Sequence, residues 1–159
     1  LQNKLLVWMQ QEINHVTYEH LLSGGGLENL YRFQRQLYRR PYPLAGLSAI
    51  DVHLQAEEGD EVAVATLRTF VNIYGQFIAD AALLWHARAG IYIAGGIAAK
   101  NVRWMQGEEF SRFFLAEKSM REVLEKMPVY LVKDELLGLK GALLMARRQV
   151  GDPSSKEGR

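Results

Sequence analysis

The sequence predicts an α/β fold that is mostly helical, with two short parallel strands packed by helices. Long stretches of the chain repeat apolar residues at i, i+3, i+4 and i+7, which is the period of an amphipathic helix. Two short, nearly uncharged stretches, residues 91–94 and 129–132, have the apolar composition of buried strands. The roughly 35 residues between them are mostly helical in pattern and long enough for a crossover between parallel strands. Because strands joined in this way are usually buried, we expect helices on both faces of the pair.

The composition favours one ordinary domain with a hydrophobic core. The chain has 159 residues, of which 48% are hydrophobic and 23% charged. Its 19 basic and 18 acidic residues leave a formal net charge of +1, so no strong field favours nucleic acid or an acidic membrane. It contains no cysteine, which excludes disulfides and cysteine-ligated zinc. The absence of cysteine fits a cytoplasmic protein, which is what we expect, and the small net charge predicts no nucleic-acid partner. We expect no membrane partner, because no apolar run reaches the roughly 18 residues of a membrane helix.

The two ends of the chain differ from its middle. The first residues, LQNKLLVWMQQEI, have the pattern of an amphipathic helix already under way at Leu1, and an element that begins so abruptly indicates a fragment. Residues 151–159 are polar and have no apolar anchor, so this tail is expected to be disordered. Residues 1–150 are therefore expected to form the folded part.

Helix-start and helix-stop residues divide the first part of the chain. Thr17 is placed to cap a short helical turn that stops at the Ser-Gly-Gly-Gly segment of residues 23–26. A second helix is expected over residues 27–40. It must end before Pro41, because the residue before a proline is pushed out of helical geometry. Residues 41–46 are predicted to form a loop.

Two capped helices are predicted after this loop. Ser48 and Asp51 resemble a capping box, with Asp in place of the usual Glu or Gln, and open a helix that ends near Gly59. Asp60 then caps the longest element, for which Gly90 is the expected terminator. The apolar residues that keep the helical period in this element are Leu67, Phe70, Val71, Tyr74, Phe77, Ile78, Ala81, Leu84 and Trp85.

The remaining elements are shorter. Gly75 lies in the middle of the longest helix and is expected to mark a close packing contact, the other interpretation being that it is merely tolerated there. Helical segments are predicted over residues 108–115 and 119–126, on the path between the two strands. A last helix is predicted over residues 136–149, after the second strand.

Two adjacent glycines, Gly95 and Gly96, stand out in the stretch GIYIAGGIAAKN. They follow the first predicted strand and precede a helical segment, and ligands bind beyond the carboxyl ends of strands in open parallel sheets. Their missing side chains would let a ligand reach the backbone. A plain strand-to-helix turn is the other interpretation, because GxGxxG and the phosphate-loop motif are both absent.

Three motifs, VTYEHLLSGGGLENLYR, GIYIAGGI and MPVYLV...LLG, occur in this order, and together they resemble the carboxyl-terminal half of bacterial ATP-dependent glucokinases. That family has the actin-like, ribonuclease H-like fold of sugar kinases, with a nucleotide cleft between two domains. The resemblance covers residues 1–149. It implies ATP-dependent phosphorylation of D-glucose to glucose 6-phosphate, with Mg²⁺ on the phosphates, and a homodimer.

The resemblance also assigns roles to individual residues. Glu19 matches the glutamate that accepts hydrogen bonds from glucose hydroxyls. Gly95 and Gly96 match the adenosine-binding glycines, and Gly24 belongs to the glycine loop that opens the next helix. Gly138 matches a glycine near the nucleotide at the start of the last helix. These residues are therefore expected to bind substrate and nucleotide.

The resemblance places the catalytic base, an aspartate, in the amino-terminal domain of the family, together with the first phosphate loop. No DxGGT motif occurs in this sequence, so no catalytic or metal-binding residue is expected here. Two alternatives remain open. The first alternative is a non-catalytic actin-like nucleotide-binding module. The second is a helical domain that dimerises through residues 60–87. A nucleotide titration separates the second alternative from the others.

Overall fold

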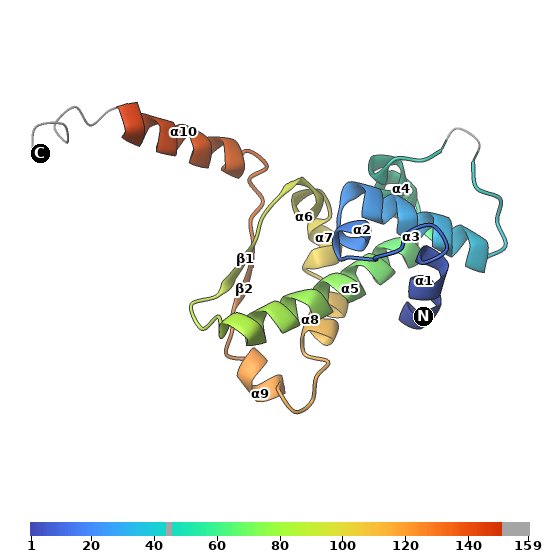
Figure 1. Ribbon diagram of the computed structural model, residues 1–159, viewed down its shortest axis with the longest axis horizontal. Helices are drawn as coiled ribbons and strands as arrows, with labels where there is room; N and C mark the ends of the chain where they lie inside the picture. Colours follow the sequence, from blue (N-terminus) through green and yellow to red (C-terminus); the bar gives the residue numbers. More distant parts are fainter. Residues whose placement is uncertain (44–45, 151–159) are drawn as a thin grey trace, which may run out of the picture.

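The computed structural model describes residues 1–43 and 46–150, and Figure 1 shows its arrangement. The predicted tail at 151–159 lies outside the described residues. In chain order the elements are α1 (Gln2–Met9), α2 (Glu19–Leu22), α3 (Gly24–Leu37), α4 (Ala49–Glu57), α5 (Glu61–Trp85), β1 (Ile91–Ile93), α6 (Gly96–Lys100), α7 (Val102–Met105), α8 (Glu108–Phe114), α9 (Arg121–Leu124), β2 (Val129–Leu131) and α10 (Leu137–Val150). Helix α10 extends away from the body of the molecule (Figure 1).

The long helix α5 lies at the centre of the fold and packs against α3, α4 and α8. As predicted, Asp60 caps it, because the Asp60 carboxylate accepts a hydrogen bond from the Ala63 N–H at 2.8 Å. The predicted terminator is wrong. The helix ends at His86, which adopts the left-handed conformation with φ of 49°, whereas Gly90 lies in the connection to β1.

Length and composition alone would let α5 cross a membrane, contrary to the expectation that no stretch of the chain qualifies. The position of α5 explains its apolar character. In its most apolar 18-residue window, 61% of the residues are buried inside the fold, and Leu67 and Phe70 are fully buried. Much of the apolar surface of α5 therefore belongs to the hydrophobic core, whereas Leu84 and Trp85 at its end are exposed.

Gly75 marks a close contact between α5 and α8, as predicted. A Cβ atom at this position would lie 2.9 Å from the Phe110 carbonyl oxygen and 3.1 Å from Phe113 Cβ. Both distances are shorter than ordinary carbon contacts. The backbone of α8 therefore approaches α5 as closely as a glycine allows.

Replacing Gly75 by Ala is expected to destabilise the protein. Overpacking a tight contact costs about 1–3 kcal/mol, so the midpoint of denaturant unfolding should fall. Gly141→Ala is the matched control, because a Cβ atom at Gly141 of α10 would meet nothing within 4 Å. This control should be neutral or slightly stabilising. A Gly75→Ala protein as stable as the wild type would show that the contact has no energetic role.

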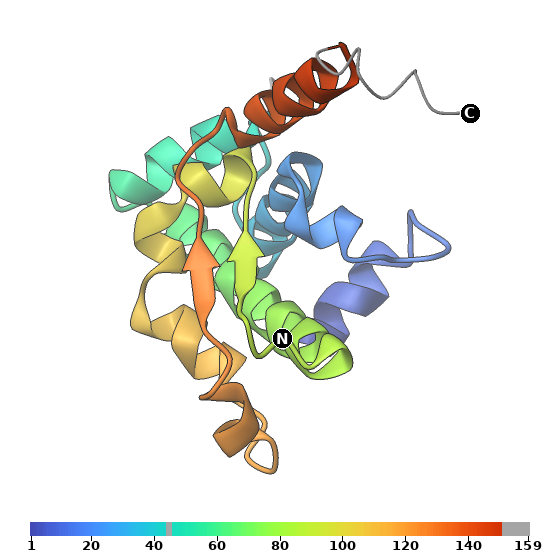
Figure 2. The same ribbon diagram turned by 90° about the vertical axis from the view of Figure 1, so that its left-hand side faces the viewer.

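The two strands pair in parallel, as predicted, with Ile91, Tyr92 and Ile93 opposite Val129, Tyr130 and Leu131. Figure 2 shows the two strands side by side. One face of the pair carries Ile93, which is 4% exposed. The opposite face carries Tyr92 and Tyr130, which stack at 4.9 Å between ring centroids and are 67% and 46% exposed. The expectation of two covered faces is therefore wrong for the described residues, because the pleat turns both tyrosines to the outside.

The first helices differ in detail from the prediction. Helix α2 begins after Tyr18 without a side-chain cap, whereas the Thr17 hydroxyl lies 3.0 Å from the His20 ring. As predicted, the short helix α2 stops at Ser23, which is its C-cap, but the glycines of residues 24–26 belong to the next helix. They form the first turn of α3, where the Ser23 hydroxyl accepts a hydrogen bond from the Gly26 N–H at 3.0 Å.

The capping box before α4 is confirmed. The Ser48 hydroxyl accepts a hydrogen bond from the Asp51 N–H at 3.3 Å, and the Asp51 carboxylate accepts one from the Ser48 N–H at 2.9 Å. Hydrogen bonds from the Ser48 hydroxyl and backbone N–H hold the pKa of Asp51 below its usual value. The start of α4 is therefore fixed by local contacts.

Candidate functional site

Two glycine motifs that are far apart in the sequence meet in the structure. A Cβ atom at Gly24, the first residue of α3, would lie 4.0 Å from Ile97 Cδ1 in α6. The start of α3 and the start of α6 therefore lie side by side. The structure brings together the SGGG and AGGI segments, which the sequence alone could not place relative to each other.

The two glycines after β1 have different roles. Gly95 has φ of +120°, a conformation that side chains strongly disfavour, so this glycine is needed for the turn into α6. Gly96 is the first residue of α6, and a Cβ atom there would meet nothing within 4 Å. The backbone turn explains Gly95. At Gly96 the missing side chain leaves open space.

A pocket opens beside Gly96, with a volume of about 380 Å³. This volume falls within the range of about 300–1,000 Å³ that is typical of small-molecule sites. Helices α3, α4 and α6 form most of its walls. The lining residues are Leu27, Ala49, Ile50, His53, Gly96, Ile97, Lys100 and Asn101.

A hydrogen-bonded pair links α4 to the end of α6 at this pocket. Asn101 is only 4% exposed. Its side-chain Nδ2 donates to the Ile97 carbonyl oxygen at 2.8 Å, and its Oδ1 lies 2.9 Å from His53 Nδ1. No pattern in the sequence points to this pair, because His53 and Asn101 belong to no recognisable motif.

A second polar contact holds α4 against α7. The Glu57 carboxylate accepts hydrogen bonds from Arg103 at 2.9 Å and from the Trp104 indole N–H at 3.1 Å. Both contacts are partly solvated, so their contribution to stability is small. These contacts help to position α4, which forms one wall of the pocket.

Glu19 is the first residue of α2 and is exposed. Helix α2 is positioned by the first turn of α3, since a Cβ atom at Gly26 would lie 2.7 Å from the Leu21 carbonyl oxygen. The Asn29 side chain also donates to the His20 carbonyl oxygen at 3.2 Å. Gly26 is therefore a packing residue that holds α2 on α3, a role that the sequence alone did not reveal.

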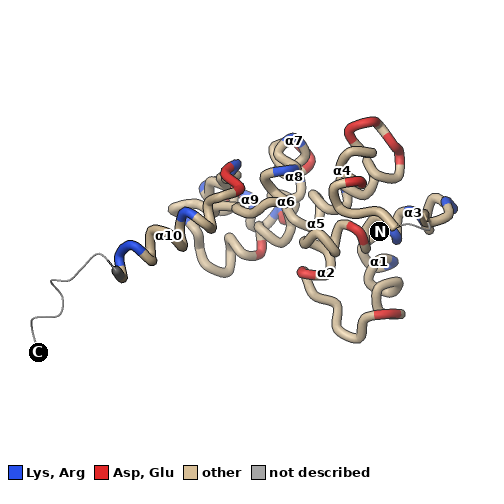
Figure 3. Tube along the Cα trace, turned by 90° about the horizontal axis from the view of Figure 1, so that it is seen from above, with Lys and Arg blue, Asp and Glu red and all other residues tan. Residues whose placement is uncertain are grey.

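Gly138 lies in the first turn of α10, and a Cβ atom there would meet nothing within 4 Å. The side chains of residues 137–149 are exposed, and the last turn of α10 carries Arg147 and Arg148 (Figure 3). Hydrogen bonds from the Lys140 ammonium and the Leu136 N–H lower the pKa of Asp134, just before this helix. The structure does not bring Gly138 into the lining of the pocket beside Gly96.

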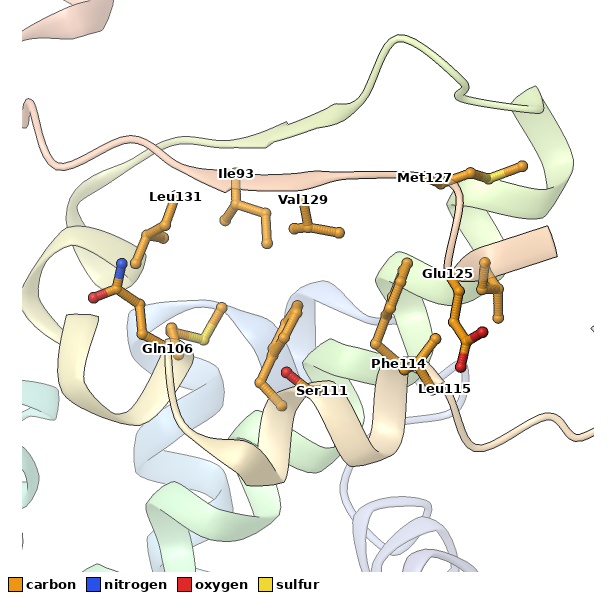
Figure 4. A pocket seen from close by; sticks show the side chains of 12 residues that line it. Ile93, Gln106, Ser111, Phe114, Leu115, Glu125, Met127, Val129 and Leu131 are labelled. Carbon is orange, nitrogen blue, oxygen red and sulfur yellow. The ribbon is translucent and has the colours of Figure 1, made fainter. Parts of the chain in front are cut away.

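A different cavity of about 490 Å³ lies between the strand pair and α8. Ile93, Val129 and Leu131 point into it from the strands, and Phe114 points toward it from α8 (Figure 4). None of the site residues predicted from the sequence lines this cavity. In the part of the chain that the structure describes, no group of three or more His, Asp or Glu residues could hold a metal ion.

Comparison with known proteins gives consistent matches. The family model described as "Glucokinase" matches residues 1–149. A glucokinase of Chromohalobacter salexigens is 32% identical in an alignment of 147 residues that covers 89% of this chain and 44% of that protein. A "Glucokinase-like protein" of Xylella fastidiosa is 32% identical over 142 residues, covering 89% of this chain and 42% of that protein.

A solved structure supports the same match. The crystal structure of a glucokinase from an Antarctic psychrotroph superimposes with a TM-score of 0.80 at 28% sequence identity. The alignment covers 92% of this chain and 45% of that one. The chain therefore spans less than half the length of the relatives that it matches.

Proposed function

The chain belongs to the glucokinase family, and we propose that it forms the carboxyl-terminal half of an enzyme that uses ATP to phosphorylate D-glucose to glucose 6-phosphate. The observation that carries the proposal is the closeness of Gly24 to Ile97, since a Cβ atom at Gly24 would lie 4.0 Å from Ile97 Cδ1. It brings the SGGG and AGGI motifs together beside a pocket at the carboxyl end of β1, where α/β proteins bind ligands.

In this proposal the residues of the chain position both substrates. Phosphoryl transfer needs alignment and charge stabilisation more than covalent chemistry from the protein. Leu27, Ile50 and Ile97 give the pocket apolar walls, and Gly96 lets the adenosine approach the backbone. Glu19 accepts hydrogen bonds from glucose hydroxyls and so orients the sugar. ATP supplies the phosphoryl group when it is bound.

The proposal assigns neither the catalytic base nor a magnesium ligand to this chain. Both functions are assigned to an amino-terminal half, and "the whole enzyme" below means the two halves together. The actin-like fold, the role of Gly138 near the nucleotide, the cytoplasmic location and the homodimer are parts of the same proposal.

The burial of α5 supports the glucokinase proposal over a domain that dimerises through the whole of this helix, although Leu84 and Trp85 at its end are exposed. Residues such as Leu67, Phe70 and Val71 of α5 are already buried within the chain, so much of the helix surface is occupied. A non-catalytic nucleotide-binding module remains the alternative, and it predicts ATP binding without turnover. An assay of glucose phosphorylation by the whole enzyme separates the two.

Gly96→Val in the whole enzyme is expected to raise the KM for ATP roughly 5- to 150-fold and to leave the KM for glucose nearly unchanged. The new side chain would fill open space in the free protein, so the clash arises only with bound nucleotide, at a cost of about 1–3 kcal/mol. Steady-state kinetics against both substrates measure this effect.

A smaller substitution and a check of folding serve as controls for this test. Gly96→Ala should show a smaller effect in the same direction, because its side chain is smaller. The melting temperature should stay close to the wild-type value in both variants. An unchanged ATP KM in a folded Gly96→Val enzyme would mean that Gly96 serves the turn alone.

A further inference from the structure

The orientation of the Asn101 side chain is fixed by its neighbours. A carbonyl oxygen can only accept hydrogen bonds, so the group 2.8 Å from the Ile97 carbonyl oxygen must be the Asn101 amide nitrogen. The Asn101 oxygen then faces His53 Nδ1 at 2.9 Å. Because Asn101 is buried, solvent cannot easily replace either partner.

This orientation also assigns the tautomer of His53. Opposite the Asn101 oxygen, His53 Nδ1 must carry the proton and donate. In a neutral imidazole the other nitrogen, Nε2, is then a hydrogen-bond acceptor. No hydrogen bond joins His53 Nε2 to any group in residues 1–43 or 46–150. The pocket therefore contains one histidine whose free nitrogen accepts.

The surroundings of His53 suit a flat apolar ring. The side chains of Leu27, Ile50 and Ile97 line the same pocket, and Lys100 is an exposed residue at its edge. Apolar walls with a few placed polar groups are typical of small-molecule sites, where the polar groups fix the orientation of the ligand.

The geometry points to His53 as the residue that selects the nucleotide base, with Nε2 accepting a hydrogen bond from the 6-amino group of adenine. This inference rests on the proposed function, because it takes the pocket beside Gly96 as the nucleotide site. A purine with oxygen at position 6 presents an acceptor there. Two acceptors would then face each other, so a 6-oxo purine is disfavoured.

The test compares ATP with inosine triphosphate (ITP), which differs from ATP by the 6-oxo group. In the whole enzyme, His53→Leu should lower kcat/KM for ATP about tenfold, the factor that one hydrogen bond contributes. It should leave ITP nearly unchanged, so the preference for ATP over ITP falls by the same factor. The affinities of both nucleotides, measured by calorimetry, should show the same change.

His53→Gln gives a sharper result. Its amide can present either an oxygen or a nitrogen to the base, so ATP should be used nearly as well as by the wild type while ITP improves. The matched control is His86→Asn at the end of α5, since Asn tolerates the left-handed conformation found there. This control should keep the wild-type ratio.

The melting temperatures show whether the two His53 variants are folded. The inference is overturned if both folded variants keep the wild-type ratio of kcat/KM for ATP to kcat/KM for ITP. It is also overturned if His53→Leu lowers kcat/KM and affinity equally for ATP and ITP, since an equal loss would indicate that His53 only packs in the pocket. The proposed function fails separately, if the wild-type whole enzyme does not phosphorylate glucose with ATP. In that case the calorimetric ratio still decides the role of His53.

Discussion

Glu19→Gln in the whole enzyme is expected to lower kcat/KM for glucose roughly 10- to 150-fold. A hydrogen bond between a carboxylate and a sugar hydroxyl in a partly dry site contributes about 1.5–3 kcal/mol, and the expected factor is this range read as a rate effect. Gln keeps the shape and one acceptor oxygen but removes the charge. The KM for ATP should change little, because the proposal directs this carboxylate to the sugar.

The control for this variant is Glu61→Gln. Glu61 is the first residue of α5 and is exposed, as Glu19 is in α2, so both substitutions remove a carboxylate from a helix start. Only Glu19→Gln should affect glucose, and both melting temperatures should stay close to the wild-type value. Wild-type glucose kinetics in Glu19→Gln would make Glu19 an ordinary surface carboxylate.

A polypeptide of residues 1–159 alone is expected to show no glucose phosphorylation above background. Loss of a general base costs 10²–10⁴-fold, and the proposal also assigns the first phosphate loop to the amino-terminal half. The assay contains ATP, Mg²⁺ and glucose, with the whole enzyme measured in parallel. Circular dichroism checks that the isolated polypeptide is helical.

This test can contradict the proposal directly. Turnover by the polypeptide, at a rate that exceeds a buffer control and falls in Glu19→Gln, would mean that a base lies within these residues. The division of the site into two halves would then be wrong. The family assignment would stand, because it rests on residues 1–149 and not on activity.

Features set by neighbouring residues could be predicted from the sequence. The cap at Asp60, the capping box at Ser48 and the two strands depend on local chemistry and short-range periodicity. The close contact at Gly75 could be predicted too, because a glycine inside an apolar helical pattern costs stability unless close packing requires it. The structure supplies the partner, which is the backbone of α8.

The start of α3 differs from the prediction, although the contacts that set it are local in the sequence. The glycines of residues 24–26 have the pattern of a helix stop, yet they begin α3, because Ser23 caps the turn. Gly26 must lack a side chain since Leu21 lies against it. The sequence alone does not reveal which chain segment approaches a glycine.

In the candidate site, too, the features set by neighbouring residues could be predicted, whereas those set by distant contacts could not. Gly95 and Gly96 could be recognised as a turn at a strand end, and their neighbour in space, Gly24, carried a motif of its own. His53 and Asn101 lie 48 positions apart, and only the folded chain brings them into one pocket. Their residue types are common in helices and turns, so no local pattern marks them.

The most direct test of a shared sugar and nucleotide site measures kcat/KM for ATP and for glucose in the Glu19→Gln and Gly96→Val forms of the whole enzyme, side by side. We expect a crossed result. Glu19→Gln loses glucose efficiency with little change for ATP, and Gly96→Val loses ATP efficiency with little change for glucose. The contrary outcome is an equal change of kcat/KM for the two substrates in both folded variants, or no change in either value. Either result would contradict the assignment of a sugar contact to Glu19 and of a separate nucleotide contact to Gly96.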